Sequence, residues 1–137
     1  MNNIYPYLII TIFILLVDFV WLYVNYNNYN RLVKNIQGSD ISVNIIGGFL
    51  SYLTVLIGLF YFSIPLITNE LNKDKNKSLL ILCIKYGGLL GLIMYGIFNT
   101  TNIGIFKNYE IYVGLIDTLW GAFLFTISSY IFILIRK

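Results

Sequence analysis

The sequence predicts an all-α protein, an integral membrane bundle of four helices. Of the 137 residues, 58% are hydrophobic and 11% are charged, whereas about 25% of the residues of an average soluble domain are charged. Four continuous apolar runs account for most of the chain. Because the runs are unbroken and are not alternating ten-residue segments, they exclude a solvent-filled β-barrel. They also exclude a water-soluble globule, a coiled coil and a disordered chain.

The four apolar runs define the expected membrane spans in chain order. They cover residues 4–26, 45–67, 79–98 and 111–135. At about 1.5 Å of rise per residue, each run can cross a hydrocarbon core roughly 30 Å thick. The first run is expected to be a true span and not a signal peptide. It is too long, and it lacks both a basic segment before it and a small-residue cleavage site after it.

Polar connectors separate the spans. They cover residues 27–44, 68–78 and 99–110. None is long enough to fold as a domain of its own, so residues 1–137 are expected to form a single transmembrane domain.

Small residues recur at helical spacing within the spans. Gly87 with Gly91, Gly47 with Ser51, and Gly114 with Gly121 are such sets. Small residues let helix backbones approach closely, which is how membrane helices associate without a hydrophobic force between them. We interpret these glycines as packing positions.

An even number of spans places both termini on one side of the membrane. That side collects five basic residues, Lys73, Lys75, Lys77, Arg136 and Lys137, and the opposite side collects three, Arg31, Lys34 and Lys107. The positive-inside rule therefore predicts both termini in the cytoplasm. Lys85, inside the third span, is interpreted as an interfacial anchor whose side chain reaches back to the headgroups.

The residue inventory narrows the chemistry. The chain has no His and a single Cys, Cys83, within an apolar run. This excludes zinc fingers, haem His ligands, Ser-His-Asp triads and an intramolecular disulfide. We expect no catalytic residue set and no cofactor, and the sequence leaves open whether a metal binds. The net charge of +3 comes from connector residues and reflects topology, so no nucleic-acid partner is expected.

Two carboxylates lie inside the predicted spans. A carboxylate at the centre of a bilayer costs about 2.5–3.5 kcal/mol on insertion scales, so each needs an explanation. Asp18 lies eight positions before the outer end of the first span, and Asp117 lies seven positions after Glu110 at the outer end of the fourth. These offsets place both at about 10–12 Å depth. We therefore expect the two acids to share one site.

Other polar residues gather in the same outer half of the predicted bundle. Asn25 follows Asp18 and Trp21 on one face of the first helix, and Tyr95, Asn99 and Asn102 share a face of the third. A polar cavity that opens to the non-cytoplasmic side would satisfy these groups. The candidate ligand-binding residues are Asp18, Trp21, Asn25, Tyr95, Asn99, Asn102, Asp117 and Trp120.

Both tryptophans of the chain follow an Asp by three residues. Asp18 precedes Trp21, and Asp117 precedes Trp120. This spacing places carboxylate and indole on one helix face. The indole N–H can then donate to the carboxylate or its ligand, and the ring can close a pocket or stack against a cation. The alternative is an interfacial aromatic anchor beside a structurally paired Asp.

These motifs resemble the pattern of domain-of-unknown-function family 2177, small predicted membrane proteins. The resemblance covers essentially the whole chain. It rests on the early Asp18–Trp21 motif, on Tyr95-Gly96-Ile97-Phe98-Asn99-Thr100-Thr101-Asn102, and on Asp117-Thr118-Leu119-Trp120-Gly121. It implies four helices and a shared pocket but no established activity. Asn99 stands where the family usually has Asp, which removes one carboxylate from the expected site. Separately, abundant Asn, Ile and Lys are typical of an AT-rich genome such as that of a giant virus.

Three functions fit these residues. In the first, Asp18 and Asp117 bind or translocate protons or a small cationic or polar ligand, and translocation through so few helices would require a homo-oligomer. In the second, the two acids serve a membrane-embedded enzyme that acts on a lipid or isoprenoid, as acid and base or as ligands of Mg²⁺. In the third, the protein is an accessory or scaffold in which the acids fix helix register. In each, the lipid bilayer is the surrounding partner.

Overall fold

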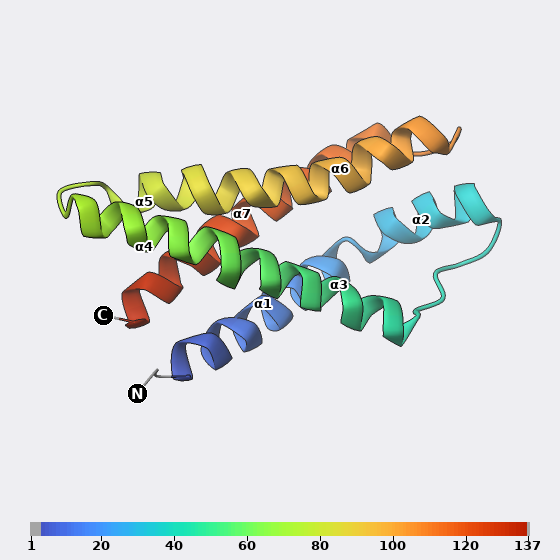
Figure 1. The fold of residues 1–137 in the computed structure, drawn as a ribbon. Coiled ribbons are helices and arrows are strands. Elements are labelled where there is room, and N and C mark those ends of the chain that lie inside the picture. Colours follow the sequence, from blue (N-terminus) through green and yellow to red (C-terminus); the bar gives the residue numbers. More distant parts are fainter. Residues whose placement is uncertain (1–3, 137) are drawn as a thin grey trace.

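The computed structural model describes residues 4–136, which form helices joined by short turns (Figure 1). The chain begins with α1 (Tyr5–Val24) and α2 (Tyr26–Gln37). Next, α3 (Ile45–Ile57) continues through the π-helical segment η1 (Gly58–Ser63) into α4 (Ile64–Lys73). In the same way, α5 (Leu79–Leu82) continues through η2 (Cys83–Gly88) into α6 (Leu89–Ile105), and α7 (Ile111–Arg136) follows.

The all-α fold predicted from the sequence is confirmed. Four continuous helices are long and apolar enough to cross a membrane, at Tyr5–Val24, Ile45–Lys73, Leu79–Ile105 and Ile111–Arg136. The second and third extend beyond the predicted spans, because the polar residues at their ends continue the helix into the connector. Within residues 4–136, α2 is a separate helix of 12 residues that is too short and too polar to span.

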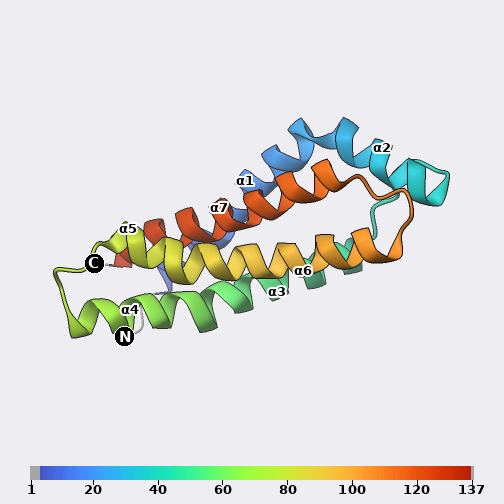
Figure 2. The same cartoon turned by 90° about the horizontal axis from the view of Figure 1, so that it is seen from above.

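Helix α7 lies at the centre of the bundle. It packs along α6 and η2 and also contacts α1, α4 and α2 (Figure 2). Its buried side chains Phe125 and Phe132 join Ile10 and Ile14 of α1 and Leu59 of η1 in one apolar cluster. In a bilayer such a cluster is held by van der Waals contact, since lipid is as apolar as the side chains. Large apolar side chains on the outer faces of the helices are exposed to the lipid.

The closest helix contact is between α6 and α7, and glycines make it possible. A Cβ atom added to Gly91 would overlap the carbonyl oxygen of Gly121. Just before α6, in η2, a Cβ atom added to Gly87 would lie 2.7 Å from the Ser129 hydroxyl oxygen and 2.8 Å from the Phe125 carbonyl oxygen of α7. The packing role predicted for these glycines is therefore confirmed, whereas Gly47 meets only the side chain of Asn44 in its own helix.

Residues 27–44 were expected to be a polar connector between the first two spans, and the structure adds that residues 27–37 of this connector are helical. They belong to α2, whose side chains are polar on one face and apolar on the other. The chain changes direction at Asn25, which lies outside helical geometry, so α1 and α2 are separate helices. Leu32 is buried, and α2 contacts α1 and α7. A short amphipathic helix has no long apolar run, which is why hydropathy alone missed it.

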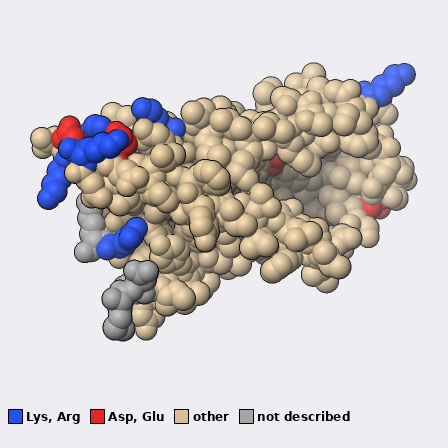
Figure 3. Space-filling view, in the orientation of Figure 1, with Lys and Arg blue, Asp and Glu red and all other residues tan. Residues whose placement is uncertain are grey.

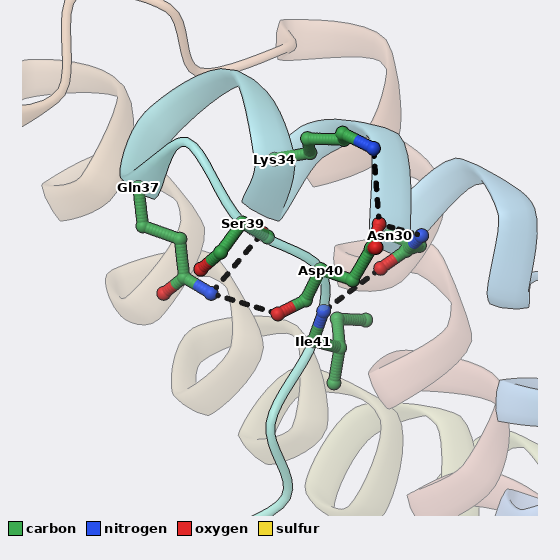
Figure 4. Close-up of polar contacts among 6 residues, drawn as sticks. All are labelled: Asn30, Lys34, Gln37, Ser39, Asp40 and Ile41. Carbon is green, nitrogen blue, oxygen red and sulfur yellow. Dashed lines mark hydrogen bonds and ion pairs between the residues drawn. The ribbon is translucent and has the colours of Figure 1, made fainter.

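The end of α2 is fixed by polar contacts with the segment that follows (Figure 4). The chain turns at Gly38, whose φ of +77° is in the left-handed region that favours glycine. The side-chain amide of Asn30 donates to Asp40 at 2.9 Å, and its oxygen accepts from the backbone N–H of Ile41 at 2.8 Å. Lys34 pairs with Asp40 at 3.4 Å. These contacts hold the turn that leads to α3.

The two ends of the bundle differ in charge. The first turn of α1, the last turn of α7 and the α4–α5 turn lie at one end, where basic side chains gather (Figures 1 and 3). There Lys73 and Lys77 pair with Glu70. At the other end Arg31 of α2 pairs with Glu110 before α7, at 2.8 Å. The cytoplasmic location of the termini stays a prediction.

The α6–α7 contact can be tested with a pair of glycine substitutions in one helix. We expect Gly91→Ala to lower the free energy of unfolding by about 1–3 kcal/mol, because the methyl group forces the two backbones apart. Gly104→Ala is the control, since its Cβ would meet nothing within 4 Å. Thermal unfolding in detergent, followed by circular dichroism, measures both. A Gly91→Ala protein as stable as Gly104→Ala would contradict this account of the packing.

Candidate functional site

Asp18 is buried in α1 and receives hydrogen bonds from two other helices. Its side chain is almost fully buried, with 8% of the residue exposed. The Trp120 indole N–H of α7 donates to Oδ1 at 2.7 Å. The Tyr52 hydroxyl of α3 donates to Oδ2 at 2.7 Å. Each carboxylate oxygen thus has a donor, as a carboxylate in an apolar environment requires.

Asp117 of α7 is half-buried and is held in the same manner by α2 and α6. The Tyr29 hydroxyl donates to Oδ1 at 2.6 Å. The Asn99 side-chain amide donates to Oδ2 at 2.8 Å and also to the Tyr95 carbonyl oxygen at 2.9 Å. The Tyr109 hydroxyl donates to Oδ1 of Asn99 at 2.6 Å, which orients the amide toward the acid. Asn99 itself is 2% exposed.

The two tryptophans stack on each other between the two acids. The ring centroids of Trp21 and Trp120 are 4.4 Å apart and the rings are within 3° of parallel. Trp120 donates to Asp18, while the Trp21 indole N–H donates at 3.0 Å to the Tyr29 hydroxyl, which in turn donates to Asp117. The stacked indoles therefore join the hydrogen-bonded groups around Asp18 to those around Asp117.

The Asp–Trp motif occurs in both α1 and α7, and each indole serves the carboxylate of the other helix. The sequence interpretation allowed the indole to serve the carboxylate of its own helix. Instead the indole of α7 serves the acid of α1 directly, and the indole of α1 serves the acid of α7 through Tyr29. The three-residue spacing places acid and indole on one face, and the two faces meet. We call this set of Asp18, Trp21, Tyr29, Tyr52, Asn99, Asp117 and Trp120 the acid–indole centre.

Two of the predicted site residues lie at the margin of the acid–indole centre. The Asn25 amide donates to the Trp21 carbonyl oxygen at 3.1 Å, so this residue satisfies the end of α1 and not a carboxylate. Asn102 lies near the Tyr109 hydroxyl, one turn beyond Asn99. Neither donates to an acid. The remaining six predicted residues are brought together.

Sequence reasoning missed the three tyrosines Tyr29, Tyr52 and Tyr109. The chain has twelve tyrosines, so residue type alone does not distinguish these three from the others. Tyr29 lies eight residues after Trp21, a helical spacing, but it falls in the segment that was expected to be a connector. Tyr52 lies one position after Ser51, on the second span. Recognition of α2 as a helix would have placed Tyr29 near the centre.

A cavity of about 520 Å³ opens beside the acid–indole centre. Figure 3 shows a hollow on this face with acidic atoms at its back. Five helices line the cavity, through Leu22, Tyr29, Ser51, Thr54, Val55, Met94, Tyr95, Phe98 and Asp117. Of the two acids only Asp117 lines it, because Tyr52 and Trp120 cover Asp18.

Tyr95 links the cavity to the packing of the bundle. Its ring lies directly against Gly121 of α7, where a side chain would overlap it. The Tyr95 side chain lines the cavity together with Tyr29 and Asp117. Among the described residues, the Tyr95 hydroxyl has no hydrogen-bond partner, so it remains free to bind a molecule in the cavity.

No basic side chain of the described residues 4–136 pairs with either acid. The basic residues of α2 are paired elsewhere, Arg31 with Glu110 and Lys34 with Asp40. The Arg31 guanidinium lowers the pKa of the Glu110 carboxyl, so this outer ion pair remains charged. Burial and the hydrogen bond to Asp117 raise the pKa of Tyr29, so its hydroxyl stays a proton donor. In the same part of the chain, no group of three or more His, Cys, Asp or Glu side chains forms a metal-binding cluster.

The fold and the buried acids define a multi-pass helical membrane protein with a polar centre inside the bundle. The chain belongs to the family of predicted membrane proteins DUF2177, whose model matches residues 3–134. No curated protein and no solved structure matches the chain. The viral origin stays a prediction.

The acid–indole centre can be tested through its stacked indoles. Trp120→Phe removes the donor to Asp18 and leaves a buried carboxylate oxygen unpaired. We expect a loss of about 1.5–3 kcal/mol in the free energy of unfolding, the range for a hydrogen bond to a charged group. We also expect loss of the exciton couplet that two parallel indoles give in circular dichroism.

Trp21→Phe is the matched variant, because its indole donates to a neutral hydroxyl. It should abolish the same couplet with a smaller loss of stability, about 0.5–1.5 kcal/mol. If either single variant keeps the couplet, the indoles are not stacked as described.

Proposed function

We propose that this protein binds a small organic cation, a protonated amine with an apolar body, in the cavity beside Asp117. One observation carries the proposal: a carboxylate lines a cavity inside the membrane part of the bundle, and no basic side chain of the described residues pairs with it. The charge that balances this acid must then come from a proton or from a ligand.

Electrostatics supports a cationic ligand. A carboxylate in a low-dielectric environment is stabilised by a nearby positive charge far more strongly than one in water. Asp117 accepts two hydrogen bonds, and an ionised carboxylate has about four acceptor positions. It therefore keeps capacity for an ammonium group. The second acid, Asp18, is joined to Asp117 through the stacked indoles and Tyr29, so the same region holds two carboxyl groups.

The remaining walls of the cavity fit the rest of such a molecule. Thr54, Ser51 and the free hydroxyl of Tyr95 offer polar contacts, whereas Leu22, Met94 and Phe98 provide apolar and aromatic surface. Aromatic faces also attract organic cations. A mostly apolar pocket with a few convergent polar groups is the usual form of a small-molecule site.

The alternative of an enzyme that acts on a phosphate-bearing lipid has less support at this centre. It requires a basic clamp for the phosphate, and the basic residues of α2 are already paired, Lys34 with Asp40. Arg31 is engaged by Glu110 through two hydrogen bonds of 3.0 and 2.8 Å.

Ligand binding can be tested with a pair of probes that differ in charge. Phenethylammonium carries the proposed cation and aromatic body, and phenethyl alcohol is its neutral analogue. We expect the cation to change the fluorescence of Trp21 and Trp120 in a saturable manner and the alcohol not to. In Asp117→Asn we expect binding about 10- to 100-fold weaker, as for loss of a hydrogen bond to a charged group.

Asp74→Asn is the control, because it removes the same charge from the exposed α4–α5 turn. Equal binding of the two probes, or unchanged binding in Asp117→Asn, would contradict the proposal. If neither probe binds and Asp117→Asn only lowers the melting temperature, the centre acts as a structural scaffold.

Translocation is a further step that uses the same site. If the cation crosses the bilayer through a homo-oligomer of this chain, liposomes that contain the wild-type protein will take it up faster than liposomes with Asp18→Asn or Asp117→Asn. Equal uptake by all three would limit the function to binding.

A further inference from the structure

A second cavity lies at the opposite end of the bundle, where the α4–α5 turn meets the end of α7. Its volume is about 500 Å³. Three basic side chains line it, Lys75 and Lys77 from the turn and Arg136 from the last turn of α7. Figure 3 shows basic atoms gathered at this end. No part of the acid–indole centre contributes to it.

Two of the three basic groups lack an acidic partner. Lys77 pairs with Glu70. Within the described residues, Lys75 and Arg136 form no ion pair, and the guanidinium of Arg136 lies 5.9 Å from the centre of the Phe132 ring. The cavity therefore presents an excess of positive charge that the neighbouring acids do not neutralise.

Below its basic mouth the cavity is apolar. Leu71 of α4, Leu79 of α5 and Ile133 of α7 form its walls, and Thr68 and Asn72 add polar groups on α4. A soluble anion would gain nothing from these apolar walls, because its charge-assisted hydrogen bonds are made to donors alone. Here cationic and apolar surfaces meet in one cavity at the end of membrane-spanning helices, which fits an amphiphile that lies in the membrane.

We propose that this cavity binds the phosphate headgroup of an anionic phospholipid, with Lys75 and Arg136 at the phosphate and the start of an acyl chain against Leu79 and Ile133. Basic pockets between membrane helices recognise anionic headgroups by this combination of charge and depth. Arg136 can bind a phosphate with two parallel N–H donors, and Lys75 adds a point charge. The prediction that this end faces the cytoplasm agrees, because anionic lipids concentrate in that leaflet.

The proposal can be tested by lipid-dependent thermal stability. Purified protein in a non-ionic detergent is titrated with a short-chain phosphatidylglycerol, with the phosphatidylcholine of equal chain length, or with inorganic phosphate. We expect saturable stabilisation by phosphatidylglycerol and much less by the other two. In Lys75→Gln/Arg136→Gln we expect the apparent Kd for phosphatidylglycerol to rise about 25-fold, at about fivefold for each charge removed.

Two further variants separate a specific site from general attraction to anions. Lys34→Gln/Lys107→Gln removes the same net charge at the other end of the bundle and should change the apparent Kd less than twofold. Lys75→Arg/Arg136→Lys keeps the charge and should retain binding, which controls for misfolding of the glutamine variant.

Equal weakening in the two glutamine variants, or equal stabilisation by both lipids, would overturn the proposal. Stabilisation by inorganic phosphate as strong as that by phosphatidylglycerol would also overturn it, since the site would then select a soluble anion. The result does not depend on the acid–indole centre. The Asp117→Asn protein should therefore show the same apparent Kd for phosphatidylglycerol as the wild type.

Discussion

Two carboxylates inside an apolar bundle must find hydrogen-bond donors within the protein, and this requirement organises the half of the structure that lies away from the chain termini. Lipid offers no partner to an oxygen of Asp18 or Asp117. The donors come from four helices other than those of the acids they serve: α7 and α3 for Asp18, α2 and α6 for Asp117. The acids thus join helices that the hydrophobic effect cannot hold together in a membrane.

The close contact between α6 and α7 makes this arrangement possible. Because Gly91 and Gly121 carry no side chains, the two backbones approach closely, and the ring of Tyr95 contacts Gly121. The same approach brings Asn99 of α6 to Asp117 of α7. Helix α2 packs against α1 and α7, where Tyr29 donates to Asp117 and Arg31 pairs with Glu110. Packing by small residues therefore positions the polar groups, and the polar groups in turn fix the register of the helices.

The bundle has two chemically opposite ends. One holds buried acids beside a cavity with no basic partner, and the other holds unpaired basic groups above an apolar cavity. The two ends share no lining residue, so the two ligands proposed above, a cation and an anionic lipid, would not compete for one site.

The sequence by itself determined the class of the protein and identified most of the residues of the acid–indole centre. Continuous apolar runs of this length require helices in a membrane, so the class could be predicted. The equal depth of Asp18 and Asp117 follows from their positions in the runs and the rise of a helix per residue. Only the tertiary structure decided which donor serves which acid, because helical periodicity describes one face of one helix and not the neighbour that it meets. It also decided that residues 26–37 form α2. That helix is stabilised by contacts with α1 and α7 and by the turn at Gly38, and local hydropathy carries no information on contacts between segments distant in the chain.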